Sequence, residues 1–184
     1  MATLIRLYKP YRVLCQFTDS AGRATLKQFV ERAGVYPAGR LDYDSEGLVL
    51  LTDDGRLQAR IAHPRGKLEK VYLVQVEGQT DAACLERLRH GVTLRDGTSR
   101  AVRVAALSAA PTLAPRDPAV PQRLQDSCSW LRITMNTGRN RQVRRMLAAV
   151  GHPVLRLVRI QVGPWLLGNL RPGEWQEERV HLPR

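Results

Sequence analysis

The sequence predicts an α+β fold with a mixed, mainly antiparallel sheet. Strand-like runs alternate with amphipathic helical stretches along the 184 residues, and hairpin-like turns occur among them. Two runs predict strands most directly: residues 47–52 are almost entirely aliphatic, and residues 70–77 alternate apolar and polar side chains. A chain of this length is expected to form one domain, so we assign residues 1–184 to a single domain with two lobes.

The other elements follow from the same patterns. Runs with strand-like character occupy residues 4–7, 12–17, 130–135 and 154–162, and a last short strand follows Trp175. Stretches with helical periodicity and capping residues occupy residues 25–34, 56–61, 81–90 and 140–150. Residues 92–107 predict a hairpin around a turn at 95–97. The same periodicity predicts that Val143, Met146, Leu147 and Val150 form a buried helix face.

Residues 108–127 interrupt this pattern. They contain Pro111, Pro115, Pro118 and Pro121. A loop of this length inside a compact domain is usually functional or mobile and seldom part of the core. We therefore expect a proline-rich loop insertion at 108–127.

The protein is strongly basic and rich in arginine. It carries 29 Lys plus Arg against 17 Asp plus Glu, a net charge of +12. Residues 127–173 contain eight arginines and no acidic residue, whereas the first 60 residues contain seven acidic ones. A compositional bias alone would not segregate charge in this way, and the planar guanidinium suits phosphate. The distribution predicts a polyanionic partner.

Several protein classes are excluded by what the sequence lacks. Its aliphatic runs are far shorter than the ~18 residues of a membrane span, and its first residues do not form a secretory signal. Cys15, Cys84 and Cys128 have no C-x-x-C spacing and are expected to be buried free thiols in a reducing compartment. We therefore expect a cytoplasmic protein with no membrane segment and no cysteine-bound metal.

A cluster of carboxylates precedes the buried strand at 47–52. Asp42, Asp44 and Glu46 alternate there, and three interpretations are open. The acids could be solvated members of a tight turn, which we favour for Asp44 and Glu46. They could bind Mg²⁺ together with Asp53 and Asp54. One carboxylate could instead act as nucleophile or base beside a cation that keeps it ionised.

The helix at 140–150 supplies a candidate cation. Helical periodicity places Arg141 and Arg145 on the solvent side and Arg144 on the flank of the buried face. A half-buried arginine is normally paired with an anion. Asp42 or Asp44 could be that anion.

Four long motifs resemble those of the RsuA/RluB/RluE/RluF group of pseudouridine synthases. Residues 37–48, together with the Leu-Thr-Asp-Asp-Gly run at 51–55, resemble the catalytic motif of the group. Residues 70–78 resemble its second motif and residues 138–147 its third. The tail also fits, with Leu-x-Arg-x-x-Val-Gly ending at Gly163 and a later run that ends at Trp175.

The N-terminal residues indicate which branch of this group the sequence resembles. Most members carry a small S4 RNA-binding module before the catalytic domain, and we expect none here. The expected absence of this module and the residues that follow Lys9-Pro10 resemble the RluE branch. That branch modifies a uridine of 23S rRNA near the peptidyl-transferase centre.

The resemblance implies a fold and a set of site residues. The fold would be that of a pseudouridine synthase catalytic domain, with two lobes flanked by helices and a central cleft. Asp42 would be the catalytic aspartate, which attacks C1′ or removes the C2′ proton. Tyr72 would stack on the flipped base and help to remove the C5 proton, Arg144 would pair with the aspartate, and Arg40 would support the catalytic loop.

The implied function is isomerisation of a specific rRNA uridine, without a cofactor. We expect the residues that contact RNA to be Lys70, Arg139, Arg141 and Arg145. The partner would be 23S rRNA or a precursor of the large subunit, and the protein would act as a monomer. A non-catalytic, basic rRNA-binding protein is the alternative, and a metal-dependent nuclease is a more distant one.

Overall fold

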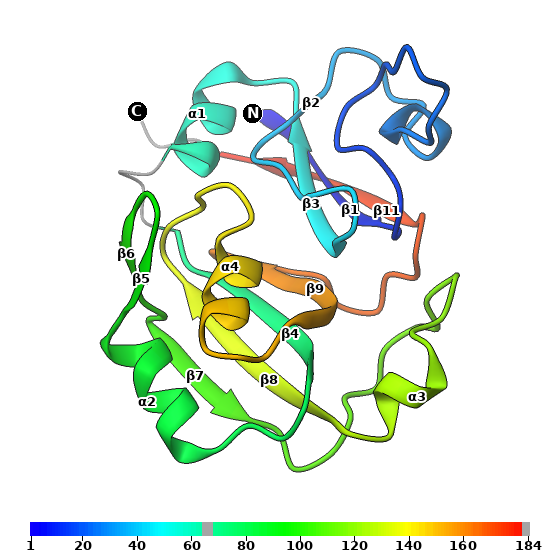
Figure 1. The fold of residues 1–184 in the computed structure, drawn as a ribbon. Coiled ribbons are helices and arrows are strands. Elements are labelled where there is room, and N and C mark those ends of the chain that lie inside the picture. Colours follow the sequence, from blue (N-terminus) through cyan, green and yellow to red (C-terminus); the bar gives the residue numbers. More distant parts are fainter. Residues whose placement is uncertain (64–67, 182–184) are drawn as a thin grey trace. The chain divides into compact units, whose positions relative to one another are not determined.

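In the computed structural model, which describes residues 1–63 and 68–181, the chain divides into two compact units. The first unit consists of residues 1–68 and 159–184, and the second consists of residues 69–158. Both units contain strands and helices (Figure 1), so the predicted α+β class is confirmed.

The first unit contains an antiparallel sheet with buried strands. β1 (Ala2–Lys9) lies antiparallel between β11 (Trp175–Val180) and β3 (Glu46–Thr52), and the short β2 (Tyr36–Pro37) pairs with β3. All seven residues of β3 are buried. A strand covered on both faces needs apolar side chains at successive positions, which explains its unbroken aliphatic run.

Smaller elements complete the first unit. α1 (Gly55–Ala62) begins at Asp54, whose carboxylate accepts a hydrogen bond of 2.8 Å from the Leu57 backbone N–H. η1 (Leu26–Gln28) is a single 3₁₀ turn. β9 (Val154–Val162) runs from the second unit into the first, where it pairs with β10 (Trp165–Leu166).

The second unit contains antiparallel strands in which β8 (Cys128–Met135) lies between β4 (Lys70–Glu77) and β7 (Arg103–Ala106). β8 pairs along its whole length with β4 and also with β7. β5 (Val92–Leu94) and β6 (Gly97–Ser99) form a separate hairpin. Three helices belong to this unit: α2 (Ala82–His90), α3 (Gln122–Gln125) and α4 (Gln142–Ala149).

Elements with strong local signals match their predicted bounds. The strands predicted at 70–77 and 154–162 are confirmed to the residue, and α2 begins after its predicted cap, Asp81, and ends before Gly91. The predicted core face of α4 is buried throughout, since Val143, Met146, Leu147 and Val150 are each 8% exposed or less.

Two predictions near the N-terminus are wrong. Residues 12–17 form no strand, because only an isolated bridge between Leu14 and Thr25 connects them to another extended segment. Residues 25–34 form only the turn η1, since the Thr25 hydroxyl donates to the Phe17 carbonyl at 3.4 Å and does not cap a helix. The predicted hairpin at 92–107 is shorter than expected, because β7 pairs with β8.

The proline-rich segment at 108–127 has little regular structure, but arginine side chains bind it. Arg116 donates to the carbonyls of Pro118 and Leu155, each at 2.9 Å. The buried Arg156 donates to the Ala114 carbonyl at 2.8 Å. Hydrogen bonds from guanidinium groups to backbone carbonyls therefore connect this segment to β9.

The close packing around Gly47 predicts that a side chain at this position would destabilise the first unit. It has a φ of +102°, and a Cβ added there would lie 2.3 Å from the Arg159 carbonyl oxygen. Gly47→Ala should therefore lower the free energy of unfolding by ~3 kcal/mol or more, measured by urea titration. Gly39 has a similar φ of +90° but no atom within 4 Å of an added Cβ. Gly39→Ala should cost only about 1–2 kcal/mol, and an equal loss in the two variants would contradict the steric argument.

Candidate functional site

The predicted catalytic residue Asp42 lies in the first unit, in the segment between β2 and β3. The Asp42 carbonyl accepts a hydrogen bond of 3.1 Å from the Ser45 N–H, which closes a tight turn. The next carbonyl, that of Tyr43, accepts a bond of 2.9 Å from the Arg12 N–H. Asp42 is half-buried, whereas the Arg40 side chain is exposed and reaches only Gln16, at 3.5 Å.

A buried arginine from β9 contacts both ends of the 40–48 segment, which contains Asp42 and the first residues of β3. The Arg159 side chain donates from Nε to the Leu48 carbonyl at 2.8 Å and from Nη1 to the Arg40 carbonyl at 3.3 Å. Arg159 stands in the tail motif that ends at Gly163, but sequence reasoning assigned it no role, because its partners lie more than 100 positions earlier in the chain. Arg40 contacts Arg159 through its backbone carbonyl oxygen, and its role as a support of the catalytic loop stays a prediction.

A buried lysine lies close to the same segment. Lys9 is fully buried, and its Nζ donates to the carbonyls of Pro10 at 2.7 Å and Val13 at 2.8 Å. Burial lowers the pKa of Lys9 from 10.5 to about 8, although the nearby carboxylates of Glu46 and Asp44 act in the opposite direction. The expectation that Glu46 is a solvated acid is wrong, since Glu46 is 2% exposed.

Two of the carboxylates considered for a metal site, Asp53 and Asp54, are used in local structure. Asp54 caps α1, and Asp53 accepts a hydrogen bond of 2.8 Å from the Thr3 N–H. Hydrogen bonding from Thr3 lowers the pKa of Asp53. Among residues 1–63 and 68–181, no group of three or more His, Cys, Asp or Glu side chains is placed to hold a metal ion.

The other predicted catalytic residues lie in the second unit. Tyr72 is 7% exposed and pairs with Ile133 in the β4–β8 ladder, and Lys70 is half-buried at the start of β4. Arg144 is half-buried in α4, as its flank position predicts, and its Nη1 lies 3.5 Å from the Val154 carbonyl oxygen. The predicted pairing of Arg144 with Asp42 would join residues of different units, and it stays a prediction.

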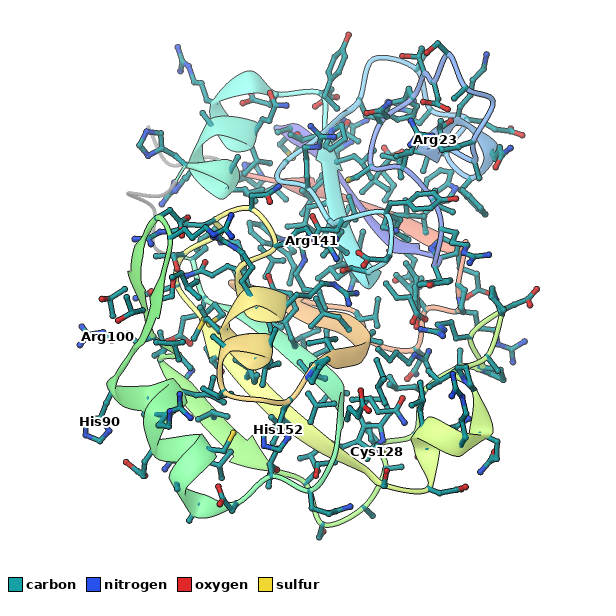
Figure 2. All side chains as sticks on the ribbon, viewed as in Figure 1. Arg23, His90, Arg100, Cys128, Arg141 and His152 are labelled. Carbon is teal, nitrogen blue, oxygen red and sulfur yellow. The ribbon has the colours of Figure 1, made fainter. Side chains whose placement is uncertain are left out.

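A buried glutamine organises the loop that leads into α4. The Gln142 amide oxygen accepts hydrogen bonds from the Thr137 hydroxyl at 3.0 Å and from the Arg139 N–H at 3.1 Å. Its amide nitrogen donates to the Ser99 hydroxyl of β6 at 3.0 Å. This fixed loop places the exposed Arg141 just before α4 with a φ of +47° (Figure 2). Sequence reasoning missed Gln142 because its partners depend on the fold.

Two arginines predicted to contact RNA contact the β5–β6 hairpin. Arg145 forms a two-pronged ion pair with Asp96, with bonds of 2.7 and 3.0 Å, and Arg139 donates to the Asp96 carbonyl at 3.1 Å. The Arg145 guanidinium lowers the pKa of Asp96. Arg145 is half-buried by this contact and not fully on the solvent side, so a phosphate would have to compete with a carboxylate for it.

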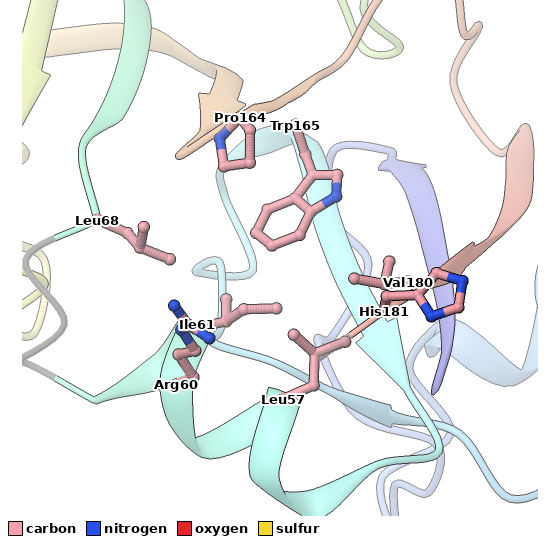
Figure 3. Close-up of a pocket in the computed structure, with 8 residues that line it drawn as sticks. All are labelled: Leu57, Arg60, Ile61, Leu68, Pro164, Trp165, Val180 and His181. Carbon is pink, nitrogen blue, oxygen red and sulfur yellow. The ribbon is translucent and has the colours of Figure 1, made fainter. Parts of the chain in front are cut away.

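An apolar pocket lies elsewhere in the first unit. It has a volume of about 250 Å³, and Figure 3 shows the side chains that surround it. The lining residues are Leu57, Arg60, Ile61, Leu68, Pro164, Trp165, Val180 and His181. None of the predicted site residues is among them. No helix in the described part of the chain is both long and apolar enough to cross a membrane.

Comparison with known sequences identifies similar proteins over almost the whole chain. The family model described as "RNA pseudouridylate synthase" matches residues 3–149. The chain is 52% identical over 183 residues to the ribosomal large subunit pseudouridine synthase E of Xanthomonas campestris, with 98% of each chain covered. It is 50% identical to the protein of that name from Vibrio parahaemolyticus, over 92% of this chain and 71% of the other.

Solved structures are similar in fold. A crystal structure of a pseudouridylate synthase superposes with a TM-score of 0.77 at 29% identity, covering 97% of this chain and 71% of the other. An archaeal Cbf5 complex superposes with a TM-score of 0.58 at 16% identity, over 89% of this chain and 49% of the other. The latter likeness concerns the fold alone.

The pKa of Lys9 predicts how stability depends on pH. Between pH 8 and 10.5 the unfolded chain keeps a proton on Lys9 that the native protein has lost, so stability should rise with pH in this window. Relative to Lys9→Met, the wild type should gain ~3 kcal/mol of unfolding free energy across the window, measured by urea titration. Lys27→Met, which removes an exposed lysine, is the control. A Lys9→Met difference that stays constant with pH would contradict the burial of a charged amine.

Proposed function

The chain belongs to the RNA pseudouridylate synthase family, and from this premise we propose that it isomerises one uridine of 23S rRNA, or of a large-subunit precursor, to pseudouridine. Membership makes the protein an isomerase that acts on RNA. The observation that carries the finer proposal is that relatives named ribosomal large subunit pseudouridine synthase E are 50–52% identical over at least 92% of the chain. We further propose that it acts as a monomer.

The proposed reaction moves the glycosidic bond within one nucleotide. The N1–C1′ bond breaks, the uracil rotates, and a C5–C1′ bond forms. C5 then loses its proton and N1 gains one, so no atom or electron is exchanged with another molecule. The substrate and an acid–base group are therefore enough to balance the reaction.

Asp42 is the proposed catalytic group. It attacks C1′ or removes the C2′ proton, and either role requires an ionised carboxylate held in place. The turn closed by Ser45 and the bonds from Arg159 support the segment in the required way. We propose that Arg144 pairs with this carboxylate and keeps it ionised.

Tyr72 is the proposed partner of the base. A uridine inside folded RNA has to be extruded before C1′ and C5 can be reached, which costs a few kcal/mol. Stacking on an aromatic ring offsets part of that cost. Tyr72 would stack on the extruded uracil and take part in removing the C5 proton.

Basic residues of the second unit are proposed to bind the RNA backbone. Lys70 and the arginines at 139, 141 and 145 lie in that unit, on β4 and around the start of α4. Phosphate contacts of this kind position the substrate and contribute affinity that salt weakens.

The central test compares two carboxylates of one turn. Asp42→Asn should abolish pseudouridine formation and leave RNA affinity within a few-fold, because the amide keeps the shape but is neither an anionic nucleophile nor a base. Asp44→Asn is the matched control and should be much milder. The assay incubates each protein with an unmodified 23S rRNA fragment and maps pseudouridine by carbodiimide treatment and primer extension.

Each alternative predicts a different result in that assay. A non-catalytic RNA-binding protein would leave the fragment unmodified even as wild type. Equal loss in Asp42→Asn and Asp44→Asn, with activity removed by EDTA and restored by Mg²⁺ but not by spermidine, would indicate a metal-dependent site. Turnover by Asp42→Asn above a tenth of the wild-type rate would show that the catalytic group is misassigned.

Salt dependence tests the proposed phosphate contacts. Replacing Arg139, Arg141 and Arg145 together by Ala should flatten the log–log slope of RNA affinity against salt by about two to three units. Single-turnover rates at saturating RNA should change little, because these side chains position the backbone. The control replaces three exposed arginines outside the 127–173 stretch, Arg23, Arg87 and Arg179. If both triple variants change the slope equally, the RNA does not bind at the start of α4.

A further inference from the structure

We propose that Arg159 is a positioning residue, which holds the 40–48 segment in the conformation that presents the Asp42 carboxylate to its substrate. The inference rests on the proposed function, in which Asp42 is the catalytic group. Its basis is the pair of hydrogen bonds from one guanidinium to carbonyl oxygens at the two ends of the segment, Arg40 at 3.3 Å and Leu48 at 2.8 Å.

The backbone of β9 restricts the same segment. A Cβ at Gly47 would lie 2.3 Å from the Arg159 carbonyl oxygen and 2.8 Å from its backbone nitrogen. Only glycine permits so close an approach, and the φ of +102° at Gly47 also favours it. The main chain of Arg159 therefore packs against the segment while its side chain binds the ends.

An arginine is costly to bury, so filling space in the core does not by itself account for Arg159. It is 3% exposed, and it lowers the pKa of Lys9, so two buried cations lie close together. A hydrophobic side chain would fill the volume without the desolvation cost of a buried charge. What a guanidinium adds is a rigid fork of donors, which can bind two carbonyls at a fixed separation.

The fork fixes the distance between the two ends of the segment. Between them the chain makes the turn in which the Ser45 N–H donates to the Asp42 carbonyl. If one end is released, the turn can shift as a unit and move the carboxylate. A displacement of about 1 Å of a reacting group can cost ~100-fold in rate.

The test measures single-turnover rate and RNA affinity separately. Arg159→Lys keeps the charge and most of the volume but cannot bind two carbonyls in the same geometry. We expect its rate at saturating 23S rRNA fragment to fall by at least ~10-fold, and that of Arg159→Met by ~100-fold. The Kd for RNA should stay within about threefold in both variants, because no phosphate contact is removed.

Arg156→Met is the matched control. Arg156 lies on the same strand, is buried, and donates to a backbone carbonyl, that of Ala114 in the proline-rich segment. Its loss should leave the single-turnover rate within about twofold, although the melting temperature falls. Methylguanidinium at millimolar concentration should restore part of the rate of Arg159→Ala, since it can replace the missing fork.

The outcomes separate this inference from the proposed function. If the wild type forms no pseudouridine, or Asp42→Asn stays active, the proposed function fails. If the wild type is active and Asp42→Asn is not, a wild-type rate in Arg159→Lys overturns the positioning role alone. A rate loss in Arg159→Lys that is matched by lost RNA affinity or lost secondary structure also overturns it, because it would show a role in stability only.

Discussion

A cation buried away from water must be surrounded by acceptors, and this requirement shapes the first unit. Lys9 and Arg159 are both buried, and the hydrogen bonds described for them end on backbone carbonyls. Lys9 binds the carbonyls of the turn after β1, and a neighbouring residue of that turn, Arg12, donates its N–H to Tyr43. Arg159 binds the carbonyls at the two ends of the Asp42 segment. A loop between strands thereby obtains the fixed backbone that a carboxylate needs if it is to react at one atom.

The sequence predicted elements whose signals are local. The β-branched run at 70–77 and the capped helix after Asp81 need no knowledge of distant residues, and both were found as predicted. Residues 12–17 and 25–34 failed for the opposite reason. Val13 and Cys15 are buried, as an inward-facing strand would place them, but a strand also needs a paired neighbour, and here the extended chain finds only one bridge. Burial alone therefore satisfied the apolar pattern without the secondary structure that the pattern usually indicates.

In the candidate site, too, local motifs could be interpreted from the sequence and long-range contacts could not. Asp42, Tyr72 and Arg144 were proposed from motifs, because they stand in recognisable runs. Arg159 and Gln142 stand in such motifs too, but their hydrogen-bond partners could not be predicted, because each acts across a long stretch of sequence: Arg159 on Leu48, 111 positions away, and Gln142 on Ser99, 43 positions away. Whether such a side chain faces a carbonyl or solvent depends on the register of strands that a single sequence does not specify.

The number of arginines in the stretch at 127–173 does not equal the number that can contact a phosphate. Its eight arginines are not equivalent. Arg156 and Arg159 are buried and bind backbone carbonyls, so they contribute to internal structure and cannot contact a phosphate directly. Arg145 forms an ion pair with Asp96. The positive field of the stretch still acts on a polyanion at long range, since buried charges add to it. In the proposed function, direct phosphate contacts are assigned to the exposed arginines at 139 and 141, and to Arg145 only where a phosphate displaces the carboxylate. Such an exchange of one anion for another costs little net charge separation, so in this proposal the β5–β6 hairpin would hold Arg145 in place before RNA binds.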